Sequence, residues 1–270
     1  MPSKFYISQF LAGALVIASN ATFASDSSLD ESVYNLISDG VVTSTTPTLS
    51  NGVNIDGVNI GVSAWADTYG SNDDIVVDAN LYKISNYYGY GVTNDDWESA
   101  HNSPDHAIDN VNQVRGNWSD FDFVLFSFDQ DVNLSSAQFT WRYSRNDSQV
   151  SVAALNDISA LTSGSSTWSD IVANALSAGS YNINTATSGY QASFDLVDTA
   201  KYWLVGAYNT VFGDNGGQMY NDAFKLSAIS FSQANTPPSG KPPAEVSEPF
   251  SIALLASGLA FIAWRRKKTR

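Results

Sequence analysis

The sequence predicts an all-β domain, built as a single β-sandwich of jelly-roll type with one short helix. Turn-forming Asn, Asp, Ser and Gly alternate with Val, Ile, Phe, Tyr and Trp through residues 25–235, a mixture typical of short strands joined by turns. Several runs have the two-residue periodicity of half-buried strands, and only one segment has a helical stripe. About two hundred residues are enough for one hydrophobic core without covalent cross-links.

The expected elements follow one another along this domain. The runs with strand character are 58–65, 75–84, 121–128, 137–143, 149–155, 202–208 and 224–231. The run 121–128 is almost continuously apolar, which predicts a central strand covered on both faces. Residues 137–143 and 149–155 are expected to pair as a hairpin. Residues 168–176 carry the helical stripe, with Ser166 or Thr167 as the N-cap.

The charge of the domain limits the classes of function. All 27 acidic residues lie in residues 25–249, together with only seven of the 13 basic ones, which leaves a formal charge of −20. Such a field repels nucleic acid, so no nucleic-acid partner is expected. The chain has no cysteine, which excludes disulfides, thiol catalysis and cysteine-ligated zinc.

The first 24 residues have the pattern of a secretory signal peptide. Lys4 supplies the basic start, and a short apolar run follows it. Small residues then end the segment, with cleavage expected between Ala24 and Ser25. Residues 25–235 are therefore expected to form the exported body.

The last 35 residues divide into a Pro-rich linker, 236–245, and a three-part tail, 246–270. The tail begins with Val246, Ser247, Glu248 and Pro249, and ends with a basic cluster that includes Arg265, Arg266, Lys267 and Lys268. As a helix, the apolar stretch 250–264 would rise roughly 22 Å, short of a hydrocarbon core of about 30 Å. The basic end is expected in the cytoplasm by the positive-inside rule, with the body on the outer side.

This motif, short helix and basic cluster resemble the PEP-CTERM sorting signal of Gram-negative bacteria, with Ser247 in place of the usual first proline. A plain tail anchor is the alternative. The body is also similar to exosortase-dependent surface proteins. The segments that carry this similarity are 63–68, 89–94, 98–99, 106–110, 202–207 and 222–226.

The resemblance implies an exported protein that signal peptidase and an exosortase process. It implies a transient inner-membrane anchor, and then a place at the cell surface or in the extracellular matrix, where exopolysaccharide is a candidate ligand. The family supplies no catalytic residues. A non-enzymatic protein that requires no cofactor is therefore the first expectation.

The loop 88–110 holds most of the candidate site residues. Its two histidines, His101 and His106, lie near Glu98, Asp105 and Asp109. A metal or acid–base site is one reading. Pro104 lies between the histidines and excludes a shared helical face. The alternative is that Asp109 and Asn110 bond the backbone of their own loop.

Calcium is the candidate metal, because it takes six to eight oxygen ligands and the loops of the body are rich in carboxylates. Asp109 and Asp222 are the candidate ligands, and Asp105, Asp214 and Asn215 flank the same loops. No twelve-residue EF-hand loop is present. A carbohydrate-binding module with structural calcium is thus the second functional expectation.

Aromatic residues near the Gly-rich turn are candidate sugar-stacking groups. These are Tyr88, Tyr90 and Trp97, beside Tyr87. The alternative is that they cover an edge of the core. A glycan-active enzyme is the third expectation, on the carboxylate pairs Asp120/Asp122 and Asp129/Asp131. These carboxylates could equally be solvated surface charge.

Overall fold

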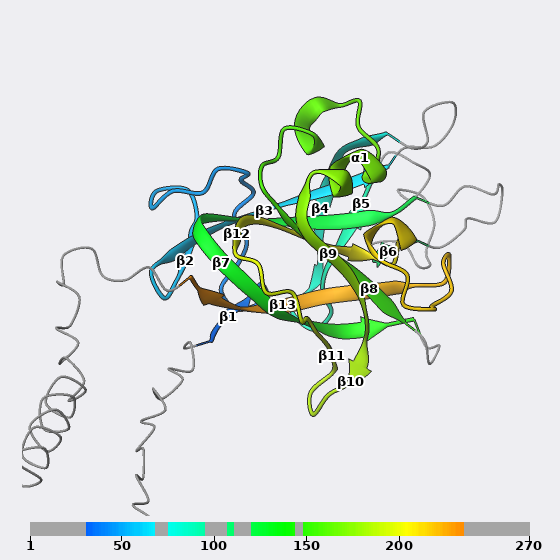
Figure 1. The fold of residues 1–270 in the computed structure, drawn as a ribbon. Helices are drawn as coiled ribbons and strands as arrows, with labels where there is room; N and C mark the ends of the chain where they lie inside the picture. Colours follow the sequence, from blue (N-terminus) through cyan, green and yellow to red (C-terminus); the bar gives the residue numbers. More distant parts are fainter. Residues whose placement is uncertain (1–30, 68–74, 95–106, 111–119, 144–147, 235–270) are drawn as a thin grey trace, which may run out of the picture.

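The computed structural model describes residues 31–67, 75–94, 107–110, 120–143 and 148–234. These residues form an all-β domain with one short α-helix, as the composition predicted (Figure 1). Among them, no helix is long and apolar enough to cross a bilayer. The predicted signal peptide, linker and sorting tail lie outside the described residues, and so do Glu98, His101, Asp105 and His106.

Five antiparallel strands close into a barrel. They are β3 (Val58–Asp67), β4 (Val76–Ser85), β5 (Gly89–Thr93), β13 (Ala223–Gln233) and β7 (Asp122–Arg142). Each strand pairs with the next in that order, and β7 then pairs with β3. The long strand β7 makes the closure possible. Its first half pairs with β3 and its second half pairs with β13.

This closure corrects the predicted jelly-roll sandwich. Two separate strands, 121–128 and 137–143, were predicted where the structure has the single strand β7, because the continuous apolar run ends before Asp129. In the structure the strand continues through them, with Asp131 exposed while Val132 and Leu134 are buried. A strand of 21 residues is long enough to take part in two regions of one sheet. Because β7 pairs with both β3 and β13, the sheet closes on itself and does not divide into the two sheets of a sandwich.

The remaining strands extend this barrel. Beside the first half of β7 lie β12 (Ala200–Ala207), β8 (Gln149–Leu155) and β9 (Ala175–Asn182), in that order. Beside its second half lie β11 (Tyr190–Ser193) and β10 (Asn184–Thr185). Short strands pair at the edges: β1 (Ser32–Asn35) and β6 (Ile108–Asp109) with β13, and β2 (Val53–Ile55) with β3. The predicted hairpin of 137–143 with 149–155 is wrong, because β8 pairs with β12 and β9 instead.

Two hydrophobic clusters cover opposite faces of the first half of β7. Val124, Phe126 and Phe128 belong to the larger one, which fills the barrel. Phe123 and Leu125 belong to the smaller one, under the helix. This alternation confirms the prediction that the run is a central strand covered on both faces, since side chains alternate between the faces of a sheet.

The helix α1 (Trp168–Ala173) begins at the predicted cap. Thr167 accepts a hydrogen bond from the backbone amide of Asp170, whose side chain accepts one from Thr167 in return. This capping box satisfies two amides that the first helical turn leaves unpaired. The helix ends earlier than predicted, because Asn174 caps it and Ala175 starts β9. Two short 3-10 helices complete the described structure, η2 (Leu161–Ser163) and η3 (Thr210–Phe212).

Candidate functional site

The two predicted calcium ligands lie side by side at one end of the barrel. Asp109 ends β6, and its register partner on β13 is Ala223, the residue after Asp222. Both carboxylates are fully buried. The two residues are more than a hundred positions apart in the sequence, and the pairing of β6 with β13 places them in adjacent segments.

The carboxylate of Asp222 is held by hydrogen bonds from two other segments. One oxygen accepts from the backbone amide of Gln149 at 2.7 Å, and the other accepts from the side-chain amide of Asn110 at 3.3 Å. Asn110 also accepts from the backbone amide of Asp222 at 2.9 Å and donates to the carbonyl of Tyr208 at 2.6 Å. Asn110 and Asp222 thus join β6, β8, β12 and β13. The side chain of Asn110 therefore bonds the backbone of Tyr208 and Asp222, and not that of its own loop as one alternative expected.

A cation already lies near Asp109. The carboxylate of Asp109 opposes the lowering of the Lys225 pKa that burial causes. The ammonium of Lys225 also lies 5.2 Å from the ring centre of Trp141. Within the described ranges, no group of three His, Asp or Glu side chains could hold a metal ion.

The two residues that were expected to flank the calcium loops accept hydrogen bonds from residues close to them in the sequence. Asp214 accepts from the Tyr208 hydroxyl and from the amide of Gly216. Asn215 accepts from the amide of Gly217.

The carboxylate pairs considered for catalysis take part in similar contacts. Asn94 donates to Asp120 and, at 3.4 Å, to Asp122, and all three residues are buried. Asp122 also accepts from the backbone amide of Asp109 at 3.3 Å. In the other pair, Asp129 accepts from the backbone and the side chain of Asn59 on β3. Asp120, Asp122 and Asp129 thus connect segments that are distant in the sequence. Of the four carboxylates, only Asp131 fits the alternative of a solvated surface charge.

A cleft of about 390 Å³ lies between the end of β3, the start of α1 and the segment 209–220. Its lining residues are Asp67, Phe121, Thr167, Trp168, Ser169, Asn209, Thr210, Val211, Met219 and Tyr220. Trp168 is packed 4.3 Å from the ring of Phe123. Tyr220 is 40% exposed and has a positive φ of 71°, which is strained for a residue with a side chain. Aromatic and polar side chains therefore line this cleft together.

Asp67 is the titratable group of this cleft. Burial raises the pKa of its carboxyl well above the ordinary value, and the nearby carboxylate of Asp120 adds to the rise. A hydrogen bond from the backbone amide of Phe121 opposes it. The sequence analysis did not select Asp67. An acidic residue at the end of an otherwise apolar strand was the available signal, but only the fold shows that it is buried.

The predicted sugar-stacking residues are separated. Tyr90 is 6% exposed and belongs to the barrel core, which corrects its assignment as a ligand residue. Tyr88 is 42% exposed and packs edge-to-face on Tyr87, with ring centres 4.9 Å apart. Trp97 lies outside the described residues. Tyr87 and Tyr88 thus remain the exposed aromatic pair at this turn.

The chain was compared with models of known protein families, with curated proteins and with solved structures, and none of them matches it. The function is therefore inferred from the residues and from the geometry of the barrel.

Proposed function

We propose that this chain is an exported, exosortase-processed surface or matrix protein whose barrel has no catalytic role. The order of signals in the sequence supports the proposal. A signal-peptide pattern precedes the barrel, and a Ser-Glu-Pro motif, an apolar segment at 250–264 and a basic cluster follow it. In this proposal, signal peptidase and an exosortase are the processing partners, and the apolar segment is a transient inner-membrane anchor.

The hydrogen bonding of the buried carboxylates is the structural observation that carries the non-catalytic role. Asp122 and Asp222 each accept from a backbone amide of another segment, and so does Asp129. A catalytic pair needs one carboxyl that is protonated and one that is ionised, both directed at a shared substrate site. Asp122, Asp222 and Asp129 join segments of the fold through their oxygens, which supports a structural role for these three carboxylates.

Intact-mass measurement of the native protein tests the proposal, in a host with its exosortase and in one without it. The mature species is expected to begin at Ser25 in both hosts. Only in the host that has the exosortase is it expected to lack everything beyond about residue 249. Glu248→Ala is expected to leave the tail attached, and Glu245→Ala, which removes the same charge just outside the motif, is expected to be processed normally. A species from the first host that still carries Trp264 and Arg265 would contradict the proposal.

A further inference from the structure

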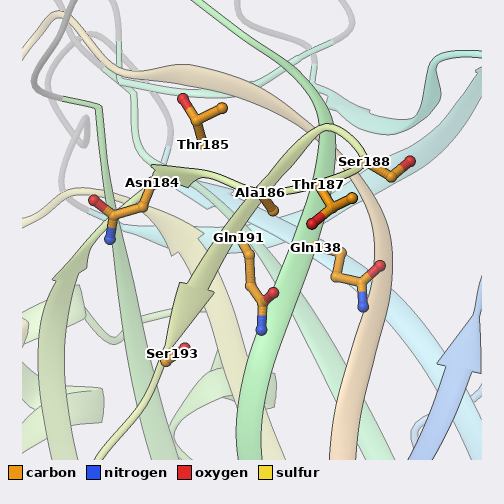
Figure 2. Close-up of a pocket in the computed structure, with 8 residues that line it drawn as sticks. All are labelled: Gln138, Asn184, Thr185, Ala186, Thr187, Ser188, Gln191 and Ser193. Carbon is orange, nitrogen blue, oxygen red and sulfur yellow. The ribbon is translucent and has the colours of Figure 1, made fainter.

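A polar hollow of about 490 Å³ lies on the side of the molecule opposite α1, where the β10–β11 hairpin meets the second half of β7 (Figures 1 and 2). Seven of its eight lining residues carry a hydroxyl or a carboxamide, and none carries a charge. They are Gln138, Asn184, Thr185, Ala186, Thr187, Ser188, Gln191 and Ser193. The lining is thus uncharged, although the domain carries a formal charge of −20.

Strand register places three carboxamides in one row across the hollow. Asn184 on β10 pairs with Gln191 on β11, and Gln191 pairs with Gln138 on β7. Directly paired residues of antiparallel strands project from the same face, with Cβ atoms about 4.5–5.5 Å apart. Figure 2 shows the side chains of Gln138 and Gln191 lying next to each other and extending in the same direction. The fold therefore presents this row as a unit.

The amides of the row are available to a ligand. Within the described part of the chain, neither Gln138 nor Gln191 makes a side-chain hydrogen bond, and Asn184 makes one, from its amide to the carbonyl of Asn182 at 3.2 Å. Each free carboxamide offers two donors and an acceptor. The neighbouring strand positions Ala137, Phe139 and Ala192 point into the barrel core, so the row stands on a packed sheet. A preorganised support of this kind lowers the entropy that binding costs.

The chemistry of the row indicates the class of ligand. Paired donors and acceptors without charge match vicinal hydroxyl groups, which both donate and accept. An anionic ligand would find no cation in the lining, and an apolar ligand would leave the amides unpaired, which is costly. Strand addition of a peptide is disfavoured, because β10 is only two residues long. We propose that this hollow binds a neutral, polyhydroxylated sugar unit of a polysaccharide.

This site differs from the aromatic residues at the Tyr88 turn, and the inference does not rest on processing of the tail. Loss of sugar binding would leave the masses of the mature species unchanged, and an unprocessed chain would still present the hollow. The two proposals therefore fail separately.

Affinity electrophoresis of the full chain tests the site, in a zwitterionic detergent that has no sugar headgroup. The gels contain dextran, mannan or galactan as neutral probes, and alginate as the anionic probe. At least one neutral polysaccharide is expected to retard the protein. The double variant Gln138→Ala/Gln191→Ala is expected to weaken that binding roughly tenfold or more, since it removes several hydrogen bonds. Asn80→Ala, an exposed carboxamide on β4, is the matched control and is expected to bind as the native protein does.

The melting temperature of the double variant separates binding from folding. It is expected to match that of the native protein, because the two side chains make no hydrogen bond in the described structure. Retention of binding within twofold in a folded double variant would overturn the site. Retardation by alginate alone, or by none of the probes, would overturn the class of ligand.

Discussion

Asp222 and Gln149 lie 73 positions apart in the sequence, and the carboxylate of Asp222 accepts a 2.7 Å hydrogen bond from the backbone amide of Gln149. This bond joins the start of β8 to the residue before β13. Both residues are buried, so water cannot replace either partner. A buried donor that loses its acceptor costs about 1–3 kcal/mol.

Asp222→Ala is therefore expected to lower the free energy of unfolding by at least about 2 kcal/mol, because it also removes the acceptor of Asn110. Urea denaturation measures the change. The control is Asp78→Ala on the outer face of β4, where the carboxylate is exposed and a change within about 0.5 kcal/mol is expected. Equal losses in the two variants would show that Asp222 does not join the strands.

Asp67 gives the stability of the protein a specific dependence on pH. Its pKa is raised in the folded state, whereas an unfolded aspartate titrates near 3.9. Between about pH 4 and the folded pKa, the folded protein binds more protons than the unfolded chain, so this residue makes stability fall as pH rises.

Asp67→Asn is expected to remove that contribution. The amide oxygen of asparagine can still accept from Phe121, so the variant is expected to be more stable than the native protein at pH 8, by a margin that narrows toward pH 4. Unfolding free energies across this range measure the difference between the two curves. Parallel curves for the two proteins would refute a raised pKa at Asp67.

Calcium binding at Asp109 and Asp222 is tested by a melting curve in millimolar calcium against sodium chloride of equal ionic strength. Equal melting temperatures are expected, because Asp222 already accepts two hydrogen bonds and the ammonium of Lys225 lies near Asp109. A specific site would stabilise the fold by about 2.7 kcal/mol at a hundredfold excess over Kd. A melting temperature several degrees higher in calcium, reversed by a chelator and lost in Asp109→Ala, would show a specific calcium site.

Gly206 on β12 lies close against Phe123 and Asp122 of the neighbouring strand β7. A Cβ at this position would lie 2.2 Å from Cγ of Phe123 and 2.4 Å from the carbonyl oxygen of Asp122. Gly206→Ala is expected to destabilise the protein by about 3 kcal/mol or more, since neither neighbour can move freely. Gly164→Ala serves as the comparison. Its φ is 67° but the space around it is open, so a loss of only about 1 kcal/mol is expected in the same denaturation experiment.

The parts of the fold that local pattern determines could be predicted from the sequence. Alternation placed strands at or near β3, β8 and β12, and the residue pattern placed the cap of α1 at Ser166 or Thr167, of which the structure has Thr167. The continuity of β7 was missed, because Asp129 looks like a turn residue until its contact with Asn59, 70 positions away, is known. The sequence analysis placed Asp109 and Asp222 in loops that a jelly roll could bring together. The burial of Asp67 and the row of Asn184, Gln191 and Gln138 could not be predicted, because they depend on contacts between distant segments.

The pairing of β7 with both β3 and β13 also sets the order in which the domain can fold. The barrel cannot close before β13, which begins at Ala223, has been synthesised. This strand supplies the partner for β5 and for the second half of β7. A chain interrupted before Ala223 exposes two unpaired strand edges, which invite pairing with other chains. During synthesis, the barrel therefore stays open until residues 223–233 have been added, and over that time the exposed strand edges need protection from aggregation.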